Sequence, residues 1–247
     1  DSLEHFMIML NALIEPLLEK AREDKIKVKG IGLSVAGIID LEEGKIIKSP
    51  NLPLLDNIKL SSRLESKTDL PIKIDNDANC FLRAEVELGA AKKYNNVYGI
   101  IIGTGIGGAW WNNNKIYYGS HNGAGEPGQM VIDFKDSIEL EQAYQKLSQN
   151  NPAKLAEEAY RGDTLAIKTY EEIGQYLGIA FANIVNLIDP ESLIIGGGVI
   201  ESSDLFLPKI KKTMRNYIMN PESRKIKILK SKLGQDAGAI GAALLIL

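Results

Sequence analysis

Apolar residues in the first part of the chain recur at spacings of three and four, which is the period of an amphipathic helix. This pattern predicts a helix over residues 3–21, with Ser2 as its N-cap. Shorter apolar or alternating runs follow, and these are typical of strands bounded by turn residues. The strands predicted in this half cover residues 26–35, 45–48 and 71–75, and two further helices cover residues 60–67 and 77–89.

The second half begins with a predicted β-hairpin. An apolar run, Val97–Ile102, leads through a glycine-rich turn into a second strand near Ala109, and Asn112–Asn114 form the next turn. The other predicted strands cover residues 130–132, 192–195 and 225–229, and the helices cover residues 138–147, 152–160, 164–187, 205–217 and 236 onward. Asp163 is the expected N-cap of the longest of these helices.

This mixture of strands and helices, with glycine turns at several strand ends, predicts an α/β fold in two layers or lobes. The sequence contains no repeat of fixed period and no low-complexity linker.

The glycine-rich turn is the first candidate for chemistry. Its sequence, Gly103-Thr-Gly-Ile-Gly-Gly108, lets backbone N–H groups approach phosphate oxygens without interference from Cβ atoms, and the Thr104 hydroxyl adds a donor. The spacing also fits a dinucleotide fingerprint, but that motif must open a helix, whereas a strand pattern follows here. No P-loop motif occurs in the sequence. Two interpretations of this segment stay open: a phosphate-binding turn between strands, and a glycine-rich hairpin without a ligand.

A second candidate is the acidic segment at the end of the strand predicted at residues 71–75. An acid at the end of a strand is well placed to take a proton from an attacking hydroxyl. The segment reads Ile74-Asp-Asn-Asp-Ala-Asn79. Neither this segment nor the glycine turn is specific by itself.

Composition narrows the class of protein. The chain has 247 residues, 45% of them hydrophobic, which suffices for one large domain or two small lobes. A net charge of −3 without a Lys/Arg-rich block argues against nucleic acid as a partner. The longest apolar stretch, residues 237–247, is too short to cross a bilayer, which takes roughly 20 residues.

The cysteine and histidine content points to a cytoplasmic protein without a zinc site. A single cysteine, Cys80, excludes a disulfide framework and fits a reducing compartment. With only His5 and His121 besides, a Cys/His zinc site cannot be assembled. The first residues lack the basic region of a secretory signal, so we expect a cytoplasmic location.

Taken together, the motifs resemble the ROK family of sugar kinases and sugar-responsive repressors. This family has the two-lobed actin-like, ribonuclease-H-like ATPase fold. The resemblance implies a small lobe of residues 1–91, joined by the C-terminal helix 233–247, and a large lobe of residues 92–232. The resemblance covers essentially the whole chain and rests on blocks that occur in the family's order. These blocks are residues 30–37, 50–53, 75–79, 103–108, 123–129, 195–199 and 234–242.

The resemblance implies an ATP- and Mg²⁺-dependent kinase that phosphorylates glucose, a related hexose or an N-acetylhexosamine. It makes Asp77 the general base that takes the proton of the attacking sugar hydroxyl, although Asp77 also suits a helix N-cap. The sugar would be bound by Asn51, Asn76, Glu126, Gln129 and Glu141. The phosphates would be held by Gly103, Thr104, Gly105 and Gly107, and the adenosine by Gly196, Gly197 and Gly198.

Several of these roles have plain structural alternatives. Asn51 and Asn76 also suit Asx turns, and Glu141 also suits the solvated face of a helix. The family resemblance further implies a homodimer.

The chain departs from the family pattern in three places. Gln129 stands where the family has a zinc-binding histidine, and residues 133–138 contain no cysteine, so we expect no zinc and packing through Phe134 instead. The D-x-G-G-T strand that opens family kinases is absent upstream of the first helix, so the fold is expected to be N-terminally incomplete. The sugar-sensing domain of a family repressor, or a catalytically inactive homologue, therefore stays open as an alternative.

Overall fold

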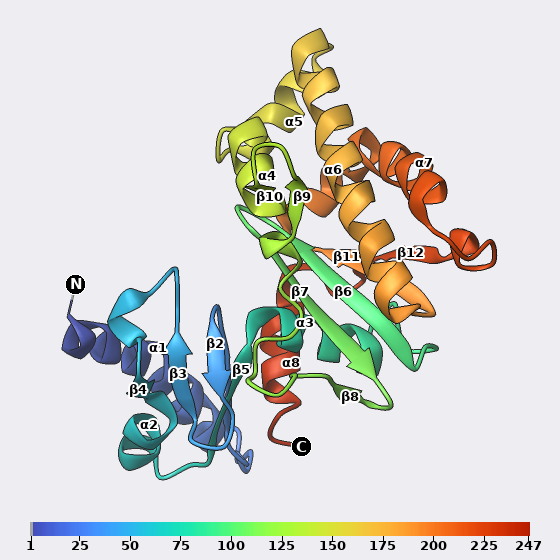
Figure 1. Cartoon of the computed structure of the whole chain (residues 1–247). Helices are drawn as coiled ribbons and strands as arrows, with labels where there is room; N and C mark the ends of the chain where they lie inside the picture. Colours follow the sequence, from blue (N-terminus) through green and yellow to red (C-terminus); the bar gives the residue numbers. More distant parts are fainter. Residues whose placement is uncertain (1) are drawn as a thin grey trace. The chain divides into compact units, whose positions relative to one another are not determined.

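The computed structural model describes residues 2–247, which form two compact units (Figure 1). The first unit ends at Cys80 and takes back the C-terminal segment Gly238–Leu247, and the second unit is Phe81–Ala237. The sequence placed these boundaries near residues 91 and 232 instead.

The difference at the first boundary has a physical reason in helix α3 (Asp77–Glu87). The ring of Phe81 lies against Gly196, and the side chain of Leu82 lies against Gly99. Both glycines belong to the sheet of the second unit, so α3 joins that unit from Phe81 onward.

Before α3, the first unit contains two small sheets and two helices that follow the predicted pattern, and α8 (Ala237–Ala243) returns to this unit from Gly238 onward. In the parallel sheet β1 (Ile31–Val35) pairs with β5 (Ile72–Asn76). The antiparallel sheet has the order β2 (Ile38–Asp40), β3 (Lys45–Lys48), β4 (Ile58–Lys59). The helical elements are α1 (Leu3–Glu23), η1 (Pro53–Leu55) and α2 (Leu60–Thr68).

Apolar faces of these elements form the core of the first unit. Ser2 caps α1 as predicted, because its hydroxyl accepts the backbone N–H of His5 at 3.2 Å. The helix then turns Met7 and Ile14 into the core, where they join buried residues of the sheets and of α2. The other buried residues of this core are Ile39, Ile46, Leu55, Leu60, Leu64, Ile72 and Ile74.

The second unit is built on a five-stranded sheet with the order β12, β11, β6, β7, β8. The strands β6, β11 and β12 are parallel, and β7 and β8 continue the sheet antiparallel. Their bounds are β6 (Asn96–Ile102), β7 (Ile106–Asn112), β8 (Lys115–Ile116), β11 (Ser192–Gly196) and β12 (Lys227–Lys230). A separate hairpin pairs β9 (Val131–Asp133) with β10 (Ile138–Glu139).

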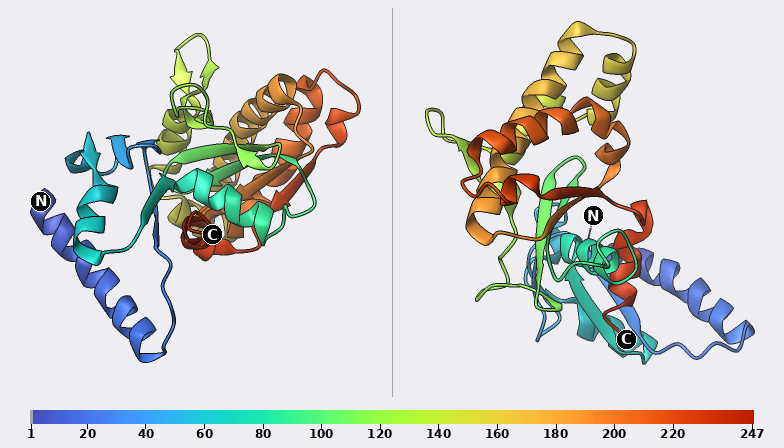
Figure 2. Two further views of the ribbon diagram at one scale, coloured as in Figure 1. Left: turned by 90° about the horizontal axis from the view of Figure 1, so that it is seen from below. Right: turned by 90° about the vertical axis from the view of Figure 1, so that its right-hand side faces the viewer.

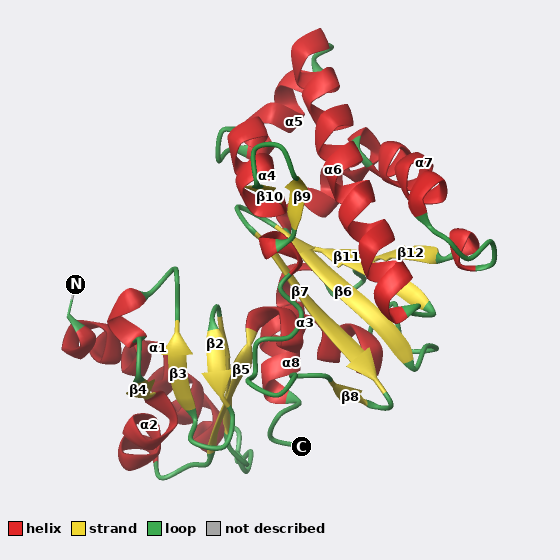
Figure 3. Ribbon diagram, in the orientation of Figure 1, coloured by secondary structure: helices red, strands yellow, loops and turns green. Residues whose placement is uncertain are grey.

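Helices cover both faces of this sheet. The helices of this unit after α3 are α4 (Leu140–Ser148), α5 (Pro152–Tyr160), α6 (Thr164–Ile188) and α7 (Leu207–Tyr217). Figure 3 shows α4 to α7 gathered together, and the left view of Figure 2 shows α3 across the sheet from α6. Short helical turns are η2 (Pro127–Gln129), η3 (Gly198–Leu205), η4 (Ser223–Lys225) and η5 (Gly234–Asp236), and α8 (Ala237–Ala243) ends the chain's regular structure.

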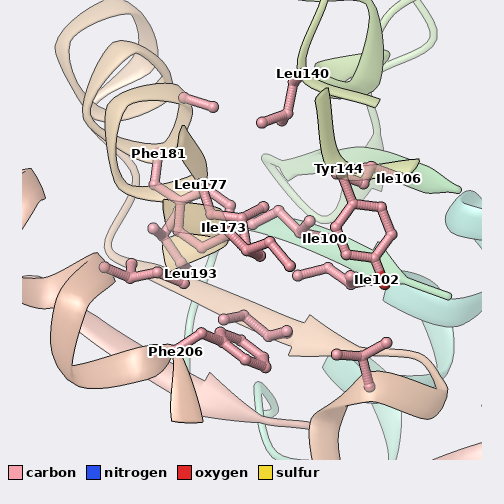
Figure 4. Close-up of a cluster of buried hydrophobic side chains, with 14 of the residues drawn as sticks. Ile100, Ile102, Ile106, Leu140, Tyr144, Ile173, Leu177, Phe181, Leu193 and Phe206 are labelled. Atoms are coloured by element: carbon pink, nitrogen blue, oxygen red, sulfur yellow. The ribbon is translucent and has the colours of Figure 1, made fainter. Parts of the chain in front are cut away.

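Alternation along the strands decides which side chains reach the main core. Ile100 and Ile102 point to the helices and pack with Leu177 and Phe181 of α6 (Figure 4). Gly99, which precedes Ile100 on the strand, faces α3 instead. Each fully buried Ile, Leu or Phe contributes about 1.5–3 kcal/mol, so this core holds the strand ends, where the glycine turns begin, in fixed positions.

Candidate functional site

In the first unit, polar contacts bring two loops to the end of strand β5. The hydroxyl of Ser49 donates to the carbonyl of Ala36 at 2.8 Å, and the Asn76 amide donates to the carbonyl of Gly37 at 2.9 Å. Ser49 is fully buried, whereas Asn51, two residues later, is exposed. The structure therefore collects Asn51, Asn76 and the start of α3 in the same region of this unit.

Asn76 is the residue that caps helix α3. Its amide oxygen accepts the backbone N–H groups of Ala78 at 2.8 Å and Asn79 at 3.3 Å. This is the Asx-turn role that the sequence left open for Asn76, and both ends of its amide thus have structural partners. Asp77 is therefore not the residue that caps α3.

The Asp77 carboxyl makes few interactions with the rest of the described chain. It accepts the backbone N–H of Ala78 at 3.0 Å, and no described cation forms an ion pair with it. The residue is exposed, yet protein atoms surround its carboxyl closely enough that desolvation raises the pKa of Asp77 above 3.8. The hydrogen bond from Ala78 opposes this rise. Such a carboxylate is accessible and more basic than an ordinary aspartate.

In the second unit, the glycine turn joins two antiparallel strands. β6 ends at Ile102, β7 begins at Ile106, and the backbone N–H of Gly103 donates to the carbonyl of Gly105 at 2.9 Å. The prediction of strand, turn and strand is confirmed, which excludes the helix that a dinucleotide fingerprint requires at this turn. A Cβ atom added at Gly103 would meet no atom within 4 Å, so this part of the turn faces open space.

Three side chains from one face of α4 hold the glycine turn. Oε2 of Glu141 accepts the backbone N–H of Ile106 at 2.6 Å. The hydroxyl of Tyr144 donates to the carbonyl of Gly103 at 2.8 Å, and the amide of Gln145 donates to that of Thr104 at 3.3 Å. Positions i, i+3 and i+4 share one face of a helix, so α4 supports the turn as a single rigid element. Glu141 therefore binds the turn through one oxygen and is not a solvated helix residue.

The segment with Glu126 and Gln129 lies directly against the same turn. Gly128, in η2, approaches so closely that a Cβ atom there would lie 2.5 Å from the carbonyl oxygen of Ile106 and 3.4 Å from Oε2 of Glu141. Glu126 and Gln129 are exposed. Glu141 is thus enclosed between the glycine turn and η2, and the structure brings all three predicted sugar-binding residues of this unit together.

The negative charge of Glu126 affects a buried tyrosine of the second unit. Burial raises the pKa of Tyr98, and the nearby Glu126 carboxylate raises it further. Glu126 also has further interactions in the structure, and so does Arg83, whose guanidinium donates to the hydroxyl of Tyr118 at 2.9 Å.

A pocket of about 340 Å³ opens beside the glycine turn. Such a volume lies in the range of small-molecule sites. Its lining residues are Gly103, Thr104, Asn150, Asn151, Pro152, Ala153, Gly198, Val199 and Ser202. The pocket therefore unites the two glycine turns that the resemblance assigned to phosphate and adenosine.

The remaining predicted cofactor residues support this pocket from the backbone. Gly107 lies in β7 opposite Ile101, and Gly196 ends β11. Gly197 has a φ of +88°, and a Cβ atom there would lie 2.3 Å from the carbonyl oxygen of Ile102, so only glycine fits. Gly105 likewise leaves room for the Glu141 side chain, because a Cβ atom at Gly105 would lie 2.5 Å from Oε2 of Glu141.

Sequence reasoning missed the third wall of the pocket, residues 150–153. Asn151 and Pro152 signal only the start of α5, where Asn151 accepts the backbone N–H of Lys154 at 3.1 Å. Asn150 adopts a left-handed φ of 55°, which turns the chain between α4 and α5. An N-cap residue followed by proline predicts the start of a helix. It does not indicate that residues 150–153 face two glycine turns that are distant in the sequence.

One expectation was wrong. The segment of residues 133–138 was expected to be held by packing of Phe134, but that side chain is 89% exposed. Backbone pairing holds the segment instead, because Ile138 pairs with Asp133 and the N–H of Leu140 donates to the carbonyl of Met130 at 2.8 Å.

Within residues 2–247, no group of three or more His, Cys, Asp or Glu side chains is arranged to hold a metal ion. Over the same residues, no helix combines the length and apolar character needed to span a membrane.

The architecture defines the class of protein: an α/β protein with the actin-like ATPase fold, with an accessible strand-end carboxylate in one unit and a glycine turn between antiparallel strands in the other. A profile of the ROK family matches residues 3–247, and the chain belongs to this family.

The relatives include enzymes and regulators. A glucokinase of Halalkalibacterium halodurans is 30% identical over 261 residues, which cover 92% of this chain and 78% of the glucokinase. A xylose repressor of Bacillus subtilis is 31% identical over 235 residues, covering 88% of this chain but 61% of the repressor. The crystal structure of a ROK family protein from Streptococcus pneumoniae TIGR4 in complex with sucrose matches with a TM-score of 0.79 and 25% identity, covering 100% of this chain and 86% of that one.

Proposed function

We propose that this chain is an ATP-dependent sugar kinase that phosphorylates a hexose of the glucose type or an N-acetylhexosamine. The observation that carries the proposal is the state of Asp77. Asn76 performs the capping of α3, so the Asp77 carboxylate stays accessible and without an ion-pair partner among the described residues. A purely structural aspartate at this position would be expected to serve as the cap.

Asp77 would act as the general base. Its carboxylate accepts the proton of the sugar hydroxyl as that oxygen attacks the phosphoryl group supplied by ATP. The raised pKa of Asp77, which burial of its carboxyl causes, supports this role, because a stronger base takes the proton more readily. Positioned bases contribute about 10²–10⁴-fold to such reactions.

The glycine turn and its pocket fit the nucleotide. Gly103 and Thr104 line one wall and offer an open backbone and a hydroxyl to phosphate oxygens, whereas Gly198 and Val199 line another. A Cβ atom at Gly103 or Gly198 would meet nothing within 4 Å, so a ligand has room there. Mg²⁺ would accompany the triphosphate, as this ion is usually bound through substrate phosphates, water and one or two carboxylates.

The side chains that the family resemblance assigns to the sugar have polar atoms available for its hydroxyls. Asn51 is exposed and has its amide free of partners within the described chain, whereas Asn76 keeps one amide hydrogen for a ligand. In the second unit Glu126 and Gln129 are exposed, and Glu141 keeps Oε1 available. Gln129 supplies both a donor and an acceptor.

A coupled assay of ADP release with a panel of hexoses and N-acetylhexosamines tests the proposal. We expect turnover with at least one sugar, and we expect Asp77→Asn to lower kcat by about 10²–10⁴-fold while sugar affinity changes little. Asp69→Asn is the matched control, since Asp69 is an exposed residue of the same unit whose left-handed backbone suits asparagine. Unchanged turnover in Asp77→Asn would show that another group removes the proton.

The similarity to a xylose repressor favours one alternative, a sugar-sensing effector domain. Thermal melts distinguish the two functions, because any ligand that binds the folded chain stabilises it. Stabilisation by both a sugar and Mg-ATP, with ADP release, supports the kinase. Stabilisation by sugar with no ADP release and no effect of nucleotide supports the sensor.

A further inference from the structure

A second pocket, of about 350 Å³, lies in the second unit between helix α7 and strand β12. Its lining combines cationic side chains with apolar ones and includes no acidic residue. The cationic residues are Lys211, Arg215, Arg224, Lys225 and Lys227, and the apolar ones are Met214, Ile226, Ile228 and Leu229. None of these residues lines the pocket beside the glycine turn.

The positive charge of this pocket is almost entirely uncompensated. Among residues 2–247, only Lys225 of the five has a carboxylate partner, Glu222 at 2.9 Å. Residues 205–232 carry nine Lys or Arg residues and one acidic residue, although acidic residues outnumber basic ones, 32 to 29, in the whole chain. The chain therefore concentrates cations at this place instead of pairing them.

This concentration opposes helix stability. Lys211 and Arg215 are four residues apart on α7, where like charges face each other and destabilise the helix. An anion bound between them would remove this repulsion.

Protection of a sheet edge accounts for only part of the pattern. β12 is the outer strand of the five-stranded sheet, and lysines on an edge strand prevent pairing with other chains. This explains Lys227 and Lys230, the first and last residues of β12. It does not explain Lys211 and Arg215, which lie on α7, or Arg224, which lies in η4.

Part of the pocket is already ordered for a ligand. Nε of Arg224 donates to the carbonyl of Ile218 at 2.8 Å, which fixes the direction of its guanidinium group. Met214 is buried, and Ile226 and Ile228 are half-buried, so an apolar surface lies beneath the cations. Fixed guanidinium groups bind phosphate through paired, charge-assisted hydrogen bonds.

We propose that this α7–β12 pocket binds a small polyanion that carries at least two phosphate groups. Its volume suits a small molecule, and the four unpaired cations require more than one negative charge. The pocket is distinct from the proposed nucleotide pocket. It includes the residues that enter β12, whereas the glycine turns follow the opposite, C-terminal ends of the parallel strands β6 and β11.

Calorimetric titration with tripolyphosphate at low ionic strength, in buffer without Mg²⁺ or nucleotide, tests this site. We expect the chain to bind tripolyphosphate under these conditions. Arg215→Gln/Lys227→Gln should weaken binding by about tenfold or more, since each lost charge-assisted hydrogen bond is a substantial part of the affinity. Neither side chain has a hydrogen-bond or ion-pair partner within the described residues, so a normal thermal melt is expected for this variant.

Lys27→Gln/Lys29→Gln is the matched control, because it removes the same charge from exposed residues of the first unit. Its affinity should stay within about twofold of the unmodified chain. An equal loss in both variants would assign the effect to net charge and overturn the proposal. Unchanged affinity in Arg215→Gln/Lys227→Gln would show that tripolyphosphate binds elsewhere and would overturn it as well. Tighter binding of an oligoglutamate peptide than of tripolyphosphate, lost in Arg215→Gln/Lys227→Gln, would assign the pocket to an acidic protein segment instead.

Discussion

Tyr144→Phe tests whether helix α4 shapes the glycine turn for nucleotide binding. Tyr144 is only 2% exposed, and its hydroxyl donates to the carbonyl of Gly103 at 2.8 Å. Phenylalanine keeps the ring and its packing but removes this one donor. The turn would then be held to α4 by Glu141 and Gln145 alone.

The expected magnitude follows from the loss of one buried neutral hydrogen bond. Such a bond contributes about 0.5–1.5 kcal/mol, and the Gly103 carbonyl would have to find water in its place. We expect the free energy of unfolding to fall by about 1 kcal/mol, which corresponds to a melting temperature lower by about 2–4 °C. If the turn must be fixed to bind phosphate, the same energy appears as about fivefold weaker nucleotide binding.

Differential scanning calorimetry and titration with Mg-AMPPNP measure the two effects on the same preparation. Tyr160→Phe is the matched control, because Tyr160 lies in the same unit and its hydroxyl donates to Asp204 at 2.8 Å, but the side chain is 57% exposed. We expect little change in this control. Unchanged nucleotide affinity in Tyr144→Phe, alongside the loss of stability, would refute the idea that α4 shapes the turn for binding. Absence of nucleotide binding in the unmodified chain would refute the kinase proposal itself.

Three further predictions concern the first unit and α3. Asn76→Ala removes the acceptor for the first N–H groups of α3 and should cost about 0.5–2 kcal/mol in urea unfolding, with Asn76→Asp recovering much of it. Because the pKa of Asp77 is raised in the folded chain, folding holds its proton more tightly, and stability is lost as pH rises through that pKa. Asp77→Asn should therefore be at least as stable as the unmodified chain at pH 7, and this advantage should vanish below about pH 3.8 in thermal melts. Gly241→Ala would put a Cβ atom 1.8 Å from the carbonyl oxygen of Cys80 and should cost about 1–3 kcal/mol or more, whereas Gly238→Ala, 3.4 Å from its nearest neighbour, should be tolerated.

Local signals in the sequence predicted most elements because their causes are local. Asp163 was expected to cap the longest helix, and its carboxylate does accept the N–H groups of Leu165 and Ala166, at 2.8 and 2.9 Å. The hairpin around the glycine turn was likewise confirmed, since strand, glycine and asparagine patterns act over a few residues. Family membership was also recognised from the motifs and confirmed by the match over residues 3–247.

Assignments that depend on distant neighbours could not be made from the sequence. Nothing in the pattern around Asn76 and Asp77 says which of them caps α3, because the answer depends on the Gly37 carbonyl that orients the Asn76 amide. Phe134 was expected to pack and is exposed, since a side chain's burial depends on which elements cover it.

By itself, the sequence determined the elements, the family and the chemical types available at the site, because propensity, capping and motif order are properties of short segments. Only the tertiary structure decided that Glu141 is enclosed between two loops, and that residues 150–153 close the pocket beside the glycine turn. It also decided that cations spread over residues 211–227 share one cavity. The physical reason is that hydrogen bonds and charge interactions act over a few ångströms in space, and only the packing of strands and helices sets which residues come that close.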